Sequence, residues 1–150
     1  MRISDDRGLE GMPLKLVIIS IMISICAPVL SSALRSYEEE SGSILLQDAL
    51  EKICGTVEEV YLSGPGNSRS LNIHVPEDPS RYVMIGGPTA TDCNSVAIID
   101  QGLELDRVYL TDPAIRLITP GAYGLVLERD TVITITCVEV SGERCVEVTT

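Results

Sequence analysis

The chain begins with a long stretch of hydrophobic positions that no charged residue interrupts. Residues 16–34 form an apolar run of 19 residues without a charge. A helix rises about 1.5 Å per residue, so this run matches the hydrocarbon thickness of a bilayer, about 30 Å. In lipid, only a helix or a closed barrel can satisfy the backbone N–H and C=O groups. The run therefore predicts one membrane-spanning helix.

A second pattern, an apolar stripe of helical period, comes after the run. Its members are spaced four, three, four and three residues apart, which places them on one helical face: Leu46, Leu50, Ile53, Val57 and Val60. The run Gly64-Pro65-Gly66 cannot continue a helix. These features predict one long helix from about residue 13 to residue 62, whose second half packs one face on a domain.

After Asn67 the pattern changes to short aliphatic runs bounded by Gly, Pro and Asp, which is typical of strands. The expected strands are residues 70–75, 81–85, 95–99, 107–110, 124–128, 131–140 and 145–149. The predicted fold class is α+β. A long N-terminal membrane-spanning helix would pack its second half on a C-terminal antiparallel β-sheet or small β-sandwich.

The charge of the chain lies beyond the apolar run. The net charge is −11, whereas the charges of residues 1–34 sum to zero. An acidic domain without a basic cluster is a poor partner for nucleic acid, so we expect no nucleic-acid binding. Arg2, Arg7 and Lys15 precede the run, and Glu38, Glu39 and Glu40 come after it. The positive-inside rule then places the N-terminus in the cytoplasm and the domain outside the cell, in a single-pass cell-membrane protein.

Three interpretations of the N-terminal segment are possible. It could be a cleaved secretory signal, with Ser31-Ser32-Ala33 as the cleavage site, or a retained signal anchor. The third possibility is a prepilin-type leader, which is cut before the apolar helix. The run is longer than a usual signal core of about 7–15 residues, which weighs against the first interpretation. A short polar leader that ends in Arg7-Gly8 favours the third.

The run RGLEGMPLKLVIISI resembles the class III signal sequence of archaeal type IV pilin-like proteins, and the later SGPGNSR is similar to the segment after the helix in that group. The resemblance covers roughly residues 7–70. It implies that a prepilin-type peptidase cuts after Gly8 and that Leu9 becomes the mature N-terminus. The chain departs from well-known pilins in one respect, because Glu10 comes immediately after Leu9 instead of lying a few residues further on.

The hydrophobic pattern and the resemblance together imply four parts of the chain, and the resemblance implies a role for each. Residues 1–8 would be the cytoplasmic leader and 9–35 the transmembrane helix. Residues 36–62 would continue the helix outside the cell, and 63–150 would form the β-rich extracellular domain. The protein would be a pilin or minor pilin of a surface filament, and its apolar helix would contact lipid and then copies of itself or other pilins. The alternative is a single-span anchored ectodomain that binds an unknown extracellular partner.

The cysteines of the domain are even in number, which suits two disulfides in an oxidising exterior: Cys54, Cys93, Cys137 and Cys145. A three-residue turn at 140–142 would place Cys137 opposite Cys145 and leave Cys54 to pair with Cys93. A two-residue turn Ser141-Gly142 would place Cys137 and Cys145 on opposite faces. We favour the first arrangement. A zinc site is the alternative, but the chain has no C-x-x-C spacing.

The sequence has no catalytic or cofactor-binding signature. It contains no G-x-S-x-G, no glycine-rich phosphate loop and no H-E-x-x-H. The single histidine, His74, alternates within an expected strand, and we expect it to be a half-exposed strand residue. We therefore expect a structural protein and not an enzyme, with no cofactor and no metal.

Overall fold

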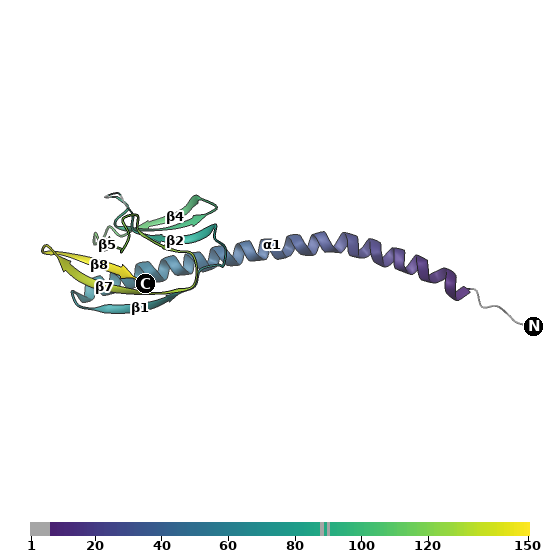
Figure 1. Cartoon of the computed structure of the whole chain (residues 1–150), viewed down its shortest axis with the longest axis horizontal. Helices are drawn as coiled ribbons and strands as arrows, with labels where there is room; N and C mark the ends of the chain where they lie inside the picture. The colour runs from purple at the N-terminus through teal and green to yellow at the C-terminus, as the bar shows by residue number, and fades with distance from the viewer. Residues whose placement is uncertain (1–6, 88, 90) are drawn as a thin grey trace, which may run out of the picture. The chain divides into compact units, whose positions relative to one another are not determined.

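A computed structural model describes residues 7–87, 89 and 91–150, with the backbone alone described for residues 7–13. Helix α1 covers Arg7–Ser63 without interruption (Figure 1), which confirms the predicted long helix and starts it earlier than the expected residue 13. The chain divides into two compact units, one that ends at Ser41 and one that covers Gly42–Thr150.

The predicted helix stop is confirmed, because α1 ends at Ser63. Gly64 takes a φ of 90°, a conformation that favours glycine. The Gly64 N–H donates to the carbonyl of Tyr61 at 3.2 Å, and the Asn67 amide donates to the carbonyl of Ser63 at 2.7 Å. The last carbonyls of the helix are thus satisfied by the turn that comes directly after it.

The second unit contains eight strands, which form two four-stranded sheets. Their bounds are β1 Ser68–Ile73, β2 Arg81–Ile85, β3 Ser95–Asp100, β4 Leu103–Tyr109, β5 Arg116–Ile118, β6 Leu125–Leu127, β7 Thr131–Val140 and β8 Glu143–Thr149. Sheet A has the order β1-β7-β8-β5 and sheet B the order β4-β3-β2-β6. All neighbours are antiparallel except β5 and β8, which are parallel.

The expected seven strands all exist, but β5 was missed and the expectation of a purely antiparallel arrangement was wrong at that strand. β5 has three residues, too few for an alternating pattern to stand out. Its register with β8 sets Leu117 beside Val146. The predicted bounds of β2 and β7 match the structure, whereas β4 begins at Leu103 instead of residue 107.

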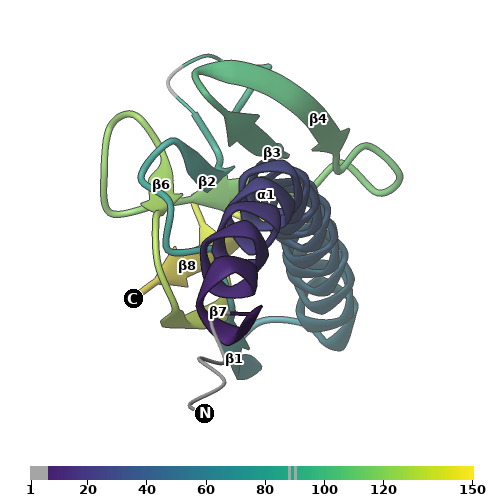
Figure 2. The ribbon, with the colours of Figure 1, turned by 90° about the vertical axis from the view of Figure 1, so that its right-hand side faces the viewer.

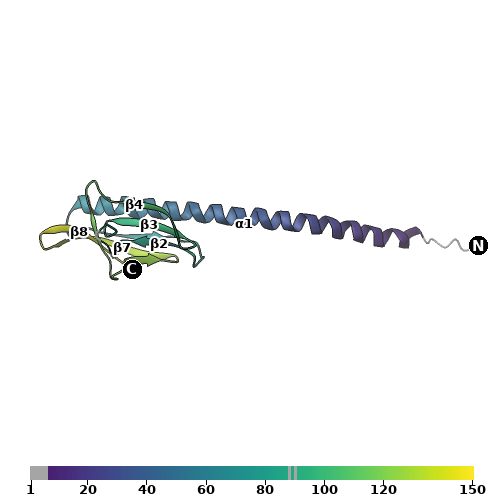
Figure 3. The same ribbon diagram turned by 90° about the horizontal axis from the view of Figure 1, so that it is seen from above.

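One hydrophobic core joins the two sheets to the second half of α1 (Figure 2). The predicted stripe is confirmed, since Leu46, Leu50, Ile53, Val57 and Val60 are all at most 4% exposed. From sheet A the core takes Ile133, Ile135 and Val146, and from sheet B it takes Val83, Ile85 and Ile98, among others. Strands β2, β3 and β4 run lengthwise along this part of the helix (Figure 3). The structure thus establishes an α+β fold with a helix on two antiparallel-rich sheets.

The turn between β7 and β8 has two residues, so the expected three-residue turn was wrong. Ser141 and Gly142 both take positive φ values, 56° and 84°, as a tight hairpin turn requires. The register sets Cys137 opposite Val146, and Val138 opposite Cys145. Cys137 and Cys145 therefore point to opposite faces of the hairpin, and a bond between them is not formed. No disulfide bond, including the expected one between Cys54 and Cys93, occurs in the part of the chain that the structure describes.

Candidate membrane and assembly helix

The first half of α1 presents its aliphatic side chains on all sides. From residue 14 to residue 40 every side chain is exposed, and the aliphatic ones from Leu14 to Leu34 are 49–66% exposed. A helix that is apolar all round is stable only when lipid or protein surrounds it. By length and composition this is a helix that could cross a membrane. The candidate functional site of the chain is therefore this surface, which we call the apolar segment (residues 16–34).

Two of the four serine hydroxyls of the apolar segment donate to carbonyls of the helix itself. The Ser24 hydroxyl donates to the carbonyl of Ser20 at 2.7 Å, and the Ser31 hydroxyl donates to the carbonyl of Ala27 at 2.9 Å. These bonds remove the cost of taking a free hydroxyl into hydrocarbon, which makes the serines compatible with lipid. Pro28 lies inside the helix, and α1 continues on both sides of it.

Charged residues bracket the apolar segment. Lys15 precedes it and Arg35 comes directly after it, and the exposed Glu38, Glu39 and Glu40 are next along the helix. Nineteen residues of helix span about 28 Å, close to the thickness of the hydrocarbon layer. The segment is thus long enough to cross a bilayer with its flanking charges outside the hydrocarbon.

The expected processing residues lie at the start of α1. The backbone of Gly8 and Leu9 is helical, and their side chains fall outside the described residues, as do residues 1–6 of the expected leader. Cleavage after Gly8 stays a prediction.

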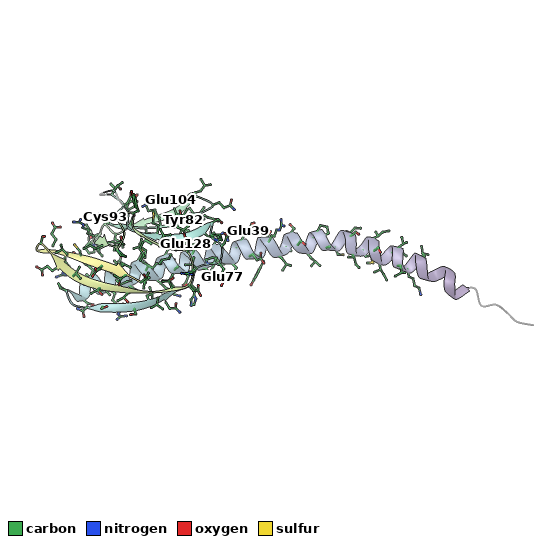
Figure 4. The ribbon with its side chains drawn as sticks, viewed as in Figure 1. Glu39, Glu77, Tyr82, Cys93, Glu104 and Glu128 are labelled. Carbon is green, nitrogen blue, oxygen red and sulfur yellow. The ribbon has the colours of Figure 1, made fainter. Side chains whose placement is uncertain are left out.

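The cysteines of the domain are dispersed. Cys54 lies on α1 in the core and is 9% exposed. Burial, together with the carboxylates of Glu58 and Asp106, raises the pKa of the Cys54 thiol to about 11. Cys93 lies in the turn before β3 (Figure 4), and its carbonyl accepts the N–H of Leu117 at 2.7 Å. Burial likewise raises the pKa of Cys137. Such thiols are poor nucleophiles at neutral pH.

His74 lies directly after β1, and its Nδ1 is 2.8 Å from Oδ2 of Asp130. The other oxygen of Asp130 accepts the N–H of Val75 at 2.9 Å. These two hydrogen bonds lower the pKa of the Asp130 carboxyl, and the hydrogen bond from His74 has the larger effect. Both side chains are more than half exposed, which agrees with the expected exposure of His74. The pair connects the end of β1 to the start of β7.

Two arginines of sheet B form ion pairs that were not predicted from the sequence. Arg81 donates through Nε to Oδ1 of Asp100 at 3.1 Å. Arg107 lies 2.6 Å from a Glu104 oxygen and donates to the Ser95 hydroxyl at 2.7 Å. The sequence did contain a sign of these pairs. An arginine stands at the edge of each aliphatic run, and in an acidic domain such an arginine is expected to form an ion pair with a carboxylate.

The second unit has two shallow surface grooves. The larger, of about 900 Å³, runs along β6 and is bordered by Glu77, Pro79, Val126, Glu128 and Arg129. Figure 4 labels two of these residues, Glu77 and Glu128. The other, of about 520 Å³, lies between β5 and the loop before β3. Among the described residues, no three His, Cys, Asp or Glu side chains gather closely enough to hold a metal ion.

Comparison of the chain with protein-family models, with curated proteins and with solved structures found no match. A function is therefore inferred from the apolar segment and from the folded unit after it.

Proposed function

We propose that this protein is a pilin-like subunit, or minor pilin, of an archaeal cell-surface filament, and that it assembles through its apolar segment. The observation that carries the proposal is the exposure of the apolar segment on all sides, in a chain whose other half folds around its own core. Each large aliphatic side chain removed from water contributes about 1.5–3 kcal/mol. A surface of this size needs a covering, and lipid and neighbouring helices are the two that suit it.

Both coverings belong to the proposed mechanism. Before assembly the bilayer surrounds the segment, with the N-terminus in the cytoplasm and the folded unit outside the cell. On assembly the segment leaves the lipid and packs against the same segment of other copies or of other pilins. Because the segment is apolar all round, it suits a bundle in which each helix has several neighbours. A prepilin-type peptidase would first cut between Gly8 and Leu9.

The placement of Lys and Arg beside the apolar segment supports an extracellular position for the folded unit. Arg2, Arg7 and Lys15 lie in the 15 residues before the segment, whereas Arg35 is the single Lys or Arg in the 15 residues after it. The positive-inside rule associates this bias with a cytoplasmic N-terminus and an exported unit after the span.

The N-terminal sequence and the intact mass of the protein from its native membrane test the proposal. A chain that begins at Leu9 and is found in filaments is the expected result. A chain that still begins at Met1 would favour a plain anchored ectodomain. A chain that begins at Leu34 would be a secreted domain without the apolar segment, and would overturn the proposal.

A further inference from the structure

Sheet B has two open edges, β4 and β6, at the two ends of its strand order; in Figure 2 β4 lies at the top and β6 at the left. In the described part of the chain no strand pairs with the outer side of either. Leu103 and Leu105 of β4 are 70% and 56% exposed. The groove of about 900 Å³ runs along β6, where Val126 is 43% exposed. An open edge presents backbone donors and acceptors that can pair with another strand.

The hydrogen bonds of the sheet show which backbone groups point outward at β6. The N–H of Gly86 donates to the carbonyl of Ser95 at 2.8 Å. In β2 the backbone N–H and C=O groups of Gly86 and of alternate residues before it therefore point toward β3. The backbone groups of Ile85 and Val83 then point toward β6, where these residues pair with Leu125 and Leu127. The N–H and C=O of Val126 therefore point to the open edge.

The same reasoning applies to β4. The N–H of Leu110 donates to the carbonyl of Asn94 at 2.8 Å, so the backbone N–H and C=O groups of Leu110 and Val108 point toward β3. Tyr109 and Arg107 alternate with them and direct their backbone groups outward. The β-bulge between β3 and β4 lies where Leu105 has no partner, so the stretch from Asp106 to Tyr109 is regular.

We propose that β4 of one copy pairs antiparallel with β6 of the next copy, with Tyr109 opposite Val126, so that sheet B continues from copy to copy. In this register the outward backbone groups of Tyr109 and Val126 meet as a hydrogen-bonded pair. The register also keeps the two faces of the sheet continuous, since Val108 and Leu127 both contact the core side.

Charge complementarity selects this register. It sets Asp106 opposite Arg129, a pair of opposite charge, near the aromatic and β-branched pair of Tyr109 and Val126. Arg107 lies opposite Glu128 but is already held by Glu104 and Ser95. Cross-strand pairs of these kinds are favourable in sheets. A shift of two residues along β4 would place Asp106 opposite Leu127. It would bring Glu104 to Arg129 instead, and Glu104 is already bound by Arg107 at 2.6 Å. Glu128 and Arg129 are exposed and lie directly after β6.

Strand direction makes this contact suit a filament. Three antiparallel steps separate β4 from β6, so the two edges already run in opposite directions within one copy. A copy shifted sideways without rotation thus presents β6 antiparallel to β4. Within one copy the helix part Gly42–Ser63 runs lengthwise along sheet B (Figures 1 and 3), so it would point the same way in every copy. A two-fold pairing of β4 with β4 would reverse the helix.

This inference depends on the proposed function. If every copy is anchored in one membrane through the chain before Gly42, the folded units share one orientation. A head-to-tail contact of this kind does not close and generates an open assembly. Since β6 has only three residues, the contact is weak alone. Anchoring raises the effective concentration of the copies, and so the pairing is expected in membranes and filaments.

The test is disulfide cross-linking of the full chain in lipid vesicles. One population carries Tyr109→Cys and the other Val126→Cys, and both carry Cys26→Ser and Cys93→Ser. Cα atoms in a hydrogen-bonded pair lie about 5.5 Å apart, within disulfide range. We expect the mixture to give roughly tenfold more heterodimer than Tyr109→Cys mixed with Val132→Cys. Val132 is a matched control, 57% exposed on the central strand β7.

A charge exchange separates pairing from general damage. Asp106→Arg in the first population is expected to lower the cross-link yield about threefold to tenfold, and Arg129→Asp in the second is expected to restore it. A yield no higher than that of the control would overturn the pairing, as would equal cross-linking of Tyr109→Cys with itself. A chain absent from the membrane fraction would overturn the proposed function, whereas an inserted chain that does not cross-link overturns the pairing alone.

Discussion

The guanidinium group of Arg81 occupies the space that a side chain at Gly42 would need. Arg81 is 8% exposed and is held by Asp100 from β3, with Nε 3.1 Å from Oδ1. Gly42 is buried at the start of the second unit, and the missing Cβ lets the arginine lie against the helix. Gly42 has a low helix propensity, but the buried ion pair of Arg81 and Asp100 needs the space that a larger residue would fill.

This contact predicts opposite effects of alanine at two helix glycines. Gly42→Ala is expected to destabilise the folded unit by about 1 kcal/mol, because displacement of Arg81 outweighs the gain in helix propensity. Gly55→Ala meets nothing within 4 Å and is expected to stabilise it by about 0.5–1 kcal/mol. Chemical unfolding of the full chain in detergent measures both. Equal stabilisation by the two substitutions would contradict the role given to Arg81.

Arg107 is expected to matter more for stability than Arg69, although both form ion pairs at 2.6 Å. The Arg107 side chain is 12% exposed and also donates to Ser95, which is fully buried. Arg107→Ala leaves that serine without its donor, and we expect a loss of about 1–3 kcal/mol. Arg69 is 59% exposed, so Arg69→Ala is expected to cost about 0–1 kcal/mol. The same unfolding experiment compares them, and similar losses would refute the distinction.

The pair of His74 and Asp130 predicts a change in an acid titration. The pKa of Asp130 is lowered from 3.8 by hydrogen bonds from His74 and Val75. A lowered pKa means that the ionised form is favoured on folding, so the contribution is present above pH 3.8 and is lost as the pH falls through the lower folded value. His74→Leu removes the larger cause. Carbon-13 NMR titration should show the pKa of Asp130 rising toward 3.8 without reaching it, because the Val75 N–H still donates. An unchanged pKa would show that His74 contributes nothing.

The sequence predicted those parts of the fold that periodicity governs. The stripe from Leu46 to Val60 requires a buried helical face, and the ten-residue alternation of Thr131–Val140 requires a strand, and both are found. The three-residue strand β5 is too short to show a period, and its parallel partner β8 is set by tertiary packing.

The cysteine arrangement was harder to predict, because it depends on one residue of turn length. Val140 belongs to β7 and not to the turn, which moves Cys137 from opposite Cys145 to opposite Val146. A strand has a period of two, so a shift of one residue changes the face of every side chain. The apolar segment, in contrast, was evident from composition alone, since no tertiary contact is needed to define it.

The apolar segment and the folded unit each contain exposed aliphatic residues. Substitution of one such residue in each by lysine tests whether lipid or water surrounds it. Ile25 is 63% exposed in the middle of the segment, and Leu62 is 70% exposed at the end of α1. If lipid or neighbouring helices surround Ile25, then Ile25→Lys is expected to cost about 3–4 kcal/mol at the centre of a bilayer, since an unfavourable lysine replaces a favourable isoleucine. Leu62→Lys replaces a side chain in water and is expected to change stability by less than about 0.5 kcal/mol. The amount of each variant that stays in carbonate-washed membranes, and the yield of filaments, report the difference. Because both lysines are equally tolerable in water, equal retention of the two variants would mean that water and not lipid surrounds the segment, and the proposed assembly would lose its basis.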